Sequence, residues 1–100
     1  MVERITPERF LEADGLAGWQ ADEGSAWATF RTGDFTSGAA FVGAIAEIAD
    51  ELNHHPDVDL RYPSVKVVSS THSAGGVTEL DVLLAQRVTA AAHARGFAID

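Results

Sequence analysis

A long stretch of helical periodicity that runs into a proline constrains the fold more than any other feature of this sequence. From about Thr36 to Leu52, apolar residues recur every three or four positions, as Phe41, Ile45, Ile48, Ala49 and Leu52. This spacing gives a helix one apolar stripe, which must be buried against another element. Pro56 cannot continue the helix, so the chain must stop there and turn. The helix therefore presents His54 and His55 at its C-terminal end.

Two further helices are predicted, one toward each end of the chain. Thr6-Pro7 supplies an N-cap residue followed by proline at the first helical position, and Asp14-Gly15 ends this short helix. Thr78-Glu79-Leu80-Asp81 resembles a capping box that begins the last helix, and Gly96 suits the position just after its end. The apolar stripe of the last helix is predicted to be Leu80, Leu83, Leu84, Val88, Ala91 and Ala92.

Strands are predicted in pairs between the helices. A short strand from Trp19 and a second over 25–32 suggest a hairpin, and the segments 57–62 and 65–72 suggest another pair. The order is therefore helix, two strands, helix, two strands, helix. This order is typical of an α+β fold with a mainly antiparallel sheet and its helices on one face.

Charge and composition narrow the possible partners and location. The 100 residues include 15 acidic and 7 basic side chains, for a formal net charge of −8, and no cysteine. Nucleic acid or an anionic membrane surface would require a basic patch, so we expect neither as a partner. There is no signal-peptide pattern at the start and no apolar run of the roughly 20 residues that span a bilayer. We expect one soluble, cytoplasmic domain over residues 1–100.

Three of the four histidines fall in two short polar stretches. His54 and His55 precede Pro56, and His72 lies in the stretch 71–78 beside two glycines that allow close backbone approach to a ligand. Imidazole is the side chain that gains and loses a proton near neutral pH. His93, among alanines of the last helix, is predicted to lie on the surface. The other three histidines are the candidates for a shared chemical task.

Several chemistries can be compared for these residues. His54 and His55 could simply end a helix, and Asp81 could serve only the capping box. One of the pair could join His72 and Asp81 around zinc or iron, although no His-x-x-x-His spacing supports a metal. A serine hydrolase would need a Gly-x-Ser-x-Gly elbow, and a phosphate loop would need a lysine and a longer turn. Proton transfer by imidazoles on a bound small molecule is the chemistry that best fits.

Two blocks of sequence, at their present separation, are similar to a known family. The residues of the second half that carry the likeness are Asn53-His54-His55-Pro56-Asp57, Tyr62, Val65, Val67, Thr71-His72, Gly75-Gly76, Thr78, Asp81 and Leu84-Ala85. Those of the first half are Gly18-Trp19, Phe30, Phe35 and Phe41. Together they resemble the pterin-4a-carbinolamine dehydratases, also called 4a-hydroxytetrahydrobiopterin dehydratases.

The resemblance implies a fold, a reaction and partners. The implied fold is α+β, with a four-stranded antiparallel sheet and three helices on one face, assembled as a homodimer or homotetramer. The implied reaction is dehydration of 4a-hydroxytetrahydropterin to quinonoid dihydropterin without a metal or organic cofactor. This reaction recycles the cofactor of aromatic amino-acid hydroxylases, one of which could be a partner in the same pathway.

The resemblance also implies site residues. His54, His55 and His72 would be the active-site histidines, and Asp81 the nearby carboxylate. As a hypothesis, His54 and His72 exchange protons on opposite sides of the pterin, His55 orients it, and Asp81 fixes a histidine tautomer or contacts the ring. Thr71 and Ser73 could provide hydrogen bonds to the pterin edge.

Two departures and one alternative accompany this resemblance. Val58 stands where many members have an aromatic residue, which affects the expected pocket rim, and Ser69 stands where an aliphatic residue is common. The family also includes members that act as dimerisation partners of a transcription factor. A non-catalytic dimerisation or regulatory module of the same fold is therefore the alternative function.

Overall fold

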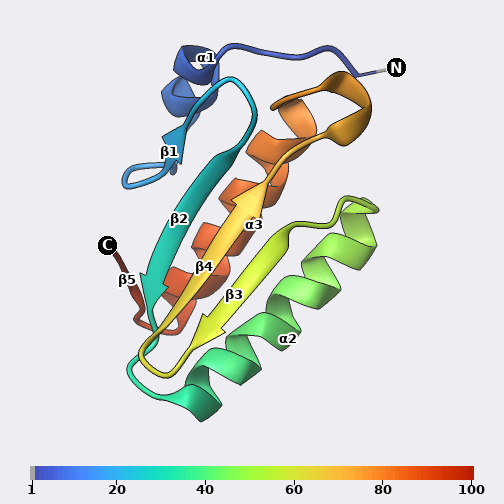
Figure 1. Cartoon of the computed structure of the whole chain (residues 1–100). Helices are drawn as coiled ribbons and strands as arrows, with labels where there is room; N and C mark the ends of the chain where they lie inside the picture. Colours follow the sequence, from blue (N-terminus) through green and yellow to red (C-terminus); the bar gives the residue numbers. More distant parts are fainter. Residues whose placement is uncertain (1) are drawn as a thin grey trace.

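The computed structural model describes residues 2–100, so Met1, the first residue of the predicted domain, lies outside the described residues. The helices are α1 (Pro7–Glu12), α2 (Phe35–Leu52), α3 (Glu79–Ala94) and the short 3-10 turn η1 (His72–Ala74). The strands are β1 (Gln20–Ala21), β2 (Ala26–Arg31), β3 (Asp57–Arg61), β4 (Ser64–Ser69) and β5 (Ala98–Ile99). Figure 1 shows their arrangement.

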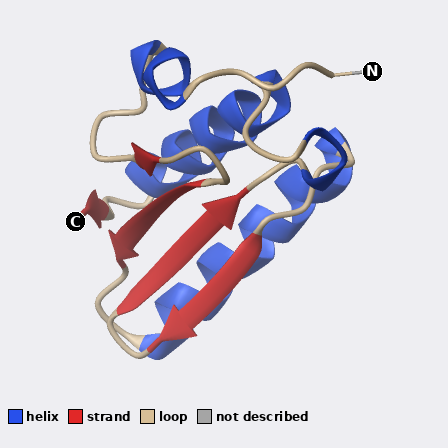
Figure 2. Ribbon diagram, turned by 45° about the horizontal axis from the view of Figure 1, so that its top comes forward, coloured by secondary structure: helices blue, strands red, loops and turns tan. Residues whose placement is uncertain are grey.

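The strands form one antiparallel sheet with the order β1-β2-β4-β3, and β5 pairs with β2 outside this order. Helices α2 and α3 cover one face of the sheet (Figures 1 and 2). The predicted α+β class is confirmed, with a sheet of five strands rather than four. The fifth strand is two residues long, too short to produce a periodic pattern in the sequence.

Two predicted details were wrong. Strand β4 ends at Ser69 rather than near His72, because the chain passes through Thr71 directly into η1. Leu83, predicted in the buried stripe of the last helix, is 45% exposed, whereas Val82 is buried. The observed buried face of α3 consists of Asp81, Val82, Leu84, Ala85, Val88, Thr89 and Ala92.

Aromatic rings connect the helices to the sheet through the core. Successive rings lie 5.4–6.2 Å apart at steep angles in the order Phe10, Trp19, Phe30, Phe41 and Phe97. Edge-to-face packing of this kind is favourable beyond the area that it buries. The indole nitrogen of Trp19 also donates to the Thr89 hydroxyl at 2.8 Å, so its polar group is satisfied in the core. This core fixes α3 relative to β1 and β2.

Candidate active site

Three chain segments that are distant in sequence meet at one end of the sheet. They are the C-terminus of α2, the end of β4 and the start of α3, all at the end over which the N-terminal segment passes (Figures 1 and 2). The two polar stretches identified in the sequence both lie at this end. The fold therefore brings the two stretches to the same side of the molecule.

The end of α2 is shaped by a left-handed residue. Asn53 has φ 51°, and its amide and that of His54 both bond back to the Ala49 carbonyl. Asparagine tolerates this conformation better than most residues, so it is a suitable helix terminator here. Pro56 then begins the extended path into β3. His54 is held in the sharp turn between these two residues, and its side chain is 10% exposed.

Asp81 is the centre of the site and is completely buried. The predicted capping box is confirmed: the Thr78 amide donates to Asp81 Oδ2 at 2.8 Å, and Thr78 caps the first turn of α3. The same carboxylate also accepts from Thr71 Oγ1 at 2.7 Å through Oδ2, and from Ser69 Oγ through Oδ1. A buried carboxylate requires such donors to offset the loss of water. Asp81 thus has partners beyond those of a helix cap.

His54 completes this set through a hydrogen bond of 2.7 Å from Nε2 to Asp81 Oδ1. With Asp81 as an ionised acceptor, the hydrogen of this bond lies on Nε2. The other ring nitrogen, Nδ1, bonds to no described residue. Within residues 2–100, Thr32 Oγ1 is the only fully buried polar side-chain atom that lacks a hydrogen-bond partner. Nδ1 is therefore not fully buried and has no protein partner in residues 2–100, so it is the ring atom that can exchange a proton.

The donor and acceptor of each hydroxyl hydrogen bond around Asp81 can be assigned. Thr71 donates to Asp81, so the 2.8 Å bond between the Thr71 and Thr78 hydroxyls must carry the hydrogen of Thr78. The Thr78 hydroxyl in turn accepts from the Leu80 amide at 3.2 Å. The hydroxyl hydrogen of Thr71 therefore bonds to the Asp81 carboxylate.

Ser69 is the site residue that sequence reasoning missed. It is fully buried at the end of β4, on the face that carries Val65 and Val67, and it donates to Asp81. The signal was its polarity at a position where the alternation calls for an apolar residue. Its partner could not be found from that signal alone, because β4 and α3 are separated by η1.

The remaining predicted site residues, His55, His72 and Ser73, are exposed and do not contact Asp81. His55 is 59% exposed and bonds to Asp50 at 3.0 Å, and its ring does not reach Asp81. His72 and Ser73 are exposed in η1 and make no side-chain hydrogen bond to residues 2–100. In the described part of the chain, no group of three or more His, Cys, Asp or Glu side chains is arranged to hold a metal ion.

The turn that carries His72 is clamped from two sides. Thr71 and Gly76 form an isolated bridge across it, and the Arg4 guanidinium donates to the Gly75 carbonyl at 3.3 Å. A Cβ at Gly76 would lie 2.5 Å from the Glu23 carbonyl oxygen and 2.7 Å from Arg4 Cδ. Only glycine fits between these neighbours. The N-terminal segment therefore helps to fix the position of the His72 turn.

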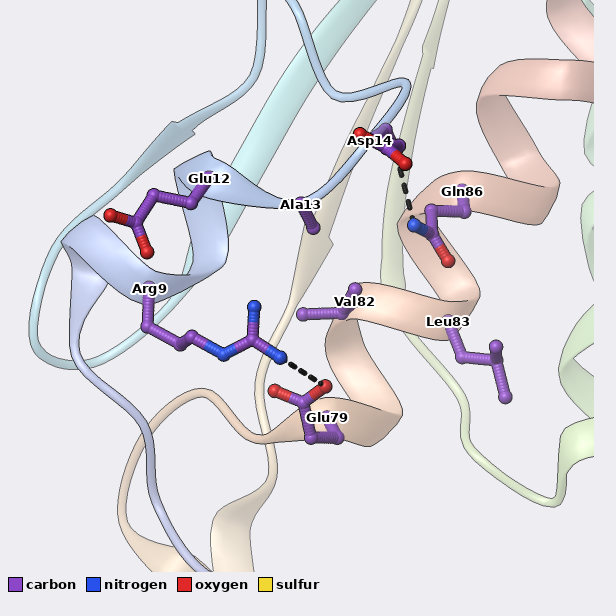
Figure 3. A pocket seen from close by; sticks show the side chains of 8 residues that line it. All are labelled: Arg9, Glu12, Ala13, Asp14, Glu79, Val82, Leu83 and Gln86. Carbon is purple, nitrogen blue, oxygen red and sulfur yellow. Dashed lines mark hydrogen bonds and ion pairs between the residues drawn. The ribbon is translucent and has the colours of Figure 1, made fainter.

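Hollows in the surface are separate from the buried carboxylate. One hollow, of about 450 Å³, lies between α1 and α3 and has no histidine in its lining; the Arg9–Glu79 ion pair crosses it (Figure 3). A smaller, mainly apolar hollow of about 190 Å³ lies between α2 and β3, with His55, Pro56 and Val58 in its lining. The size of a hollow does not identify the chemistry here, because the polar convergence is at Asp81.

Fold and site together define a class of protein: a small α+β protein with a histidine held by a buried carboxylate at one end of its sheet. Comparison with known families agrees. The family model described as pterin 4 alpha carbinolamine dehydratase matches residues 3–91. The chain belongs to the pterin-4-alpha-carbinolamine dehydratase family.

Individual relatives are similar over most of their length. A Streptomyces coelicolor protein is 44% identical over 82 residues, covering 81% of each chain. A Thermomicrobium roseum protein is 38% identical over 73 residues, covering 73% of this chain and 78% of its own. Both carry the name "putative pterin-4-alpha-carbinolamine dehydratase". A Brucella melitensis crystal structure, titled transcriptional coactivator/pterin dehydratase, matches with a TM-score of 0.81 and 35% identity, over 90% of this chain and 99% of that one.

Proposed function

We propose that this protein dehydrates a 4a-hydroxytetrahydropterin to quinonoid dihydropterin by histidine acid/base catalysis. The single observation that carries the proposal is the bond from His54 Nε2 to buried Asp81, which leaves Nδ1 without a partner among the described residues in a member of a dehydratase family. A histidine fixed in this way can exchange a proton at one defined atom. The reaction would recycle the pterin cofactor of an aromatic amino-acid hydroxylase in the cytoplasm.

The reaction needs two proton transfers. The bond between C4a and its hydroxyl oxygen breaks as an acid gives that oxygen a proton, so that water leaves. A base removes a proton from a ring nitrogen, and the electron pair forms the new double bond. The number of protons on the protein is unchanged once acid and base have both acted, so the two groups can reset through solvent.

We assign these transfers to His54 and His72. His54 acts at Nδ1, while Asp81 holds Nε2 and fixes the tautomer. His72, exposed in η1, acts from a second segment at the same end of the sheet. His55 orients the pterin, and Ser73 offers a free hydroxyl to its edge. Thr71 contributes through Asp81, because its hydroxyl hydrogen is already committed there.

Replacing both proposed proton-transfer groups tests this function. In His54→Ala/His72→Ala, loss of general acid–base catalysis should lower the dehydration rate by on the order of a hundredfold or more. The measurement follows the disappearance of synthetic 4a-hydroxytetrahydropterin with and without protein. His93→Ala, an exposed histidine at the other end of α3, should keep the full rate. An unchanged rate in the double variant would rule out the assignment.

A second candidate function is a non-catalytic dimerisation or regulatory module. It is favoured by the Brucella melitensis structure, whose title names a transcriptional coactivator as well as a pterin dehydratase. Strand β3, which pairs only with β4 among the described strands, offers an edge for a homodimer or homotetramer. If the wild-type protein does not accelerate disappearance of the carbinolamine, this function becomes the better one.

A further inference from the structure

We propose that Ser69 is a positioning residue that holds Asp81 Oδ1 in place for His54 and so keeps the imidazole in its Nε2-protonated tautomer. The inference deepens the proposed dehydratase function and, for its effect on rate, rests on it. Its structural part, the effect of Ser69 on the state of His54, can be measured without any substrate.

The two oxygens of Asp81 have different tasks. Oδ2 accepts from the Thr78 amide and the Thr71 hydroxyl, contacts that secure the start of α3. Within residues 2–100, Oδ1 accepts from His54 and Ser69 alone. Removing the Ser69 hydroxyl therefore leaves the helix cap intact and removes one of the two donors that orient the oxygen facing His54. This separation distinguishes a positioning role from a role in general stability.

Burial makes the Ser69 contact effective. Both Ser69 and Asp81 are completely buried, so water cannot replace a lost donor without entering the core. The position of Ser69 is fixed by the pairing of β4 with β2, in which it lies opposite Ala26. A hydroxyl on a paired strand is a more rigid support than one on a loop. With that support gone, Oδ1 keeps His54 as its donor within residues 2–100 and can shift away from Nε2 while Oδ2 stays bound to the helix cap, so that His54 can adopt the other tautomer.

A shift of Asp81 Oδ1 would change the chemistry at the other ring nitrogen, Nδ1. With hydrogen on Nε2, neutral His54 presents a lone pair at Nδ1 and can act as a base there. In the other tautomer, Nδ1 carries the hydrogen and the lone pair faces the protein. Loss of the Ser69 hydroxyl should therefore lower kcat more than it changes KM.

The chain provides a matched control in the next residue. Ser70 is also a serine near the end of β4, but its hydroxyl donates to the Gly24 carbonyl at 2.8 Å instead of to Asp81. Ser70→Ala removes a hydroxyl from the same segment without touching the carboxylate. Ser69→Thr keeps a hydroxyl at the critical position, and Ser69→Val matches the apolar character of Val65 and Val67.

The experiment records ring-nitrogen chemical shifts of ¹⁵N-histidine-labelled protein, with His54→Gln used to assign the His54 signals. Wild type and Ser70→Ala should show the Nε2-protonated tautomer, and Ser69→Thr should restore it. Ser69→Ala and Ser69→Val should show a mixture of tautomers, and kcat should fall by roughly ten- to a hundredfold, as expected for losing a hydrogen bond to a charged group.

Three results would overturn the proposal. The first is a wild-type tautomer in both Ser69→Ala and Ser69→Val; the second is an equal change in Ser70→Ala; the third is a change of tautomer with no change of kcat in an active enzyme. If wild type is inactive toward the carbinolamine, the dehydratase proposal fails, and the tautomer measurement still decides whether Ser69 positions His54. If Ser69→Ala does not fold, Ser69→Val supplies the comparison.

Discussion

Asp81 is a single residue that both starts the first turn of α3 and holds the ring of His54. Because Asp81 is buried, water cannot replace a lost partner, and losing the carboxylate costs more stability than losing His54. If His54 is truncated, Asp81 keeps its bonds from Ser69, Thr71 and the Thr78 amide. If Asp81 is truncated, all these donors lose their common acceptor. The carboxylate is therefore the residue on which the local structure depends most.

This asymmetry predicts the stabilities of two variants. Asp81→Ala should lower the free energy of unfolding by about 3–5 kcal/mol, the range for removing one partner of a buried charged contact. His54→Ala should lower it by less, because Asp81 retains other donors. Urea unfolding monitored by tryptophan fluorescence gives both values. A greater loss in His54→Ala than in Asp81→Ala would contradict this ranking.

At this scale the sequence predicts only part of the site. The spacing from Thr78 to Asp81 is local, so the capping box could be predicted and is confirmed. The contacts of Asp81 with Ser69 and His54 join residues 12 and 27 positions away. Such contacts depend on strand register and on the angle at which α2 ends, and no local pattern encodes them.

At the scale of elements, α2 shows how each end of a helix is set by one residue. Asp34 precedes Phe35 in extended conformation and accepts from the Ser37 amide at 2.8 Å, so the helix begins one residue before the predicted Thr36. Asn53 ends it in the left-handed region. The strong apolar period between these caps made α2 predictable, whereas the two-residue strands β1 and β5 depend on pairing with β2.

The N-cap of α2 predicts a pH dependence. The hydrogen bond from the Ser37 amide lowers the pKa of Asp34 below its usual value of 3.8. A pKa lowered by folding means that the ionised group stabilises the folded state above the usual pKa. This contribution is lost as the pH falls through the lowered value.

Asp34→Ala should therefore unfold at a lower temperature than wild type at pH 7, and the difference should shrink below about pH 4. Thermal unfolding by circular dichroism at pH 7, 4 and 2.5 measures it. Asp34→Asn is the control, because its amide oxygen can still cap the helix but does not titrate. A difference between Asp34→Ala and wild type that stays constant with pH would contradict the assignment.

At the scale of the whole molecule, the two edges of the sheet differ in how they are covered. The outer edge of β2 is covered by β1 beside Ala26 and Trp27, and by β5 beside Phe30 and Arg31. Asp100 extends this cover through its amide bond to the Thr29 carbonyl, at 2.8 Å, and its ion pair with Arg31. Uncovered strand edges promote association with other chains. The short strands thus protect one edge and leave β3 as the other.

Deleting residues 98–100 should expose the second half of the β2 edge and increase self-association. Light scattering after size-exclusion chromatography, over a range of protein concentrations, measures the change in mass. Asp100→Ala removes only the ion-pair side chain and keeps β5, so it should behave like wild type. Equal association of wild type and the deletion variant would show that β5 does not protect this edge.

Within residues 2–100, no helix is both long and apolar enough to cross a membrane. The fold class was predictable because alternating groups of strands and helices restrict how layers can pack. The fifth strand and the Arg4 contact with the His72 turn were not, since both arise only when distant segments meet.

The shared carboxylate of Asp81 also couples the folding of the first turn of α3 to the order of the His54 ring. Because the same group starts α3 and orients His54, a molecule in which that first turn has unwound cannot keep an ordered histidine. If His54 transfers the proton as proposed above, incompletely folded molecules should have no dehydratase activity. Slow hydrogen exchange at the Thr78 amide would serve as a built-in marker of a finished molecule.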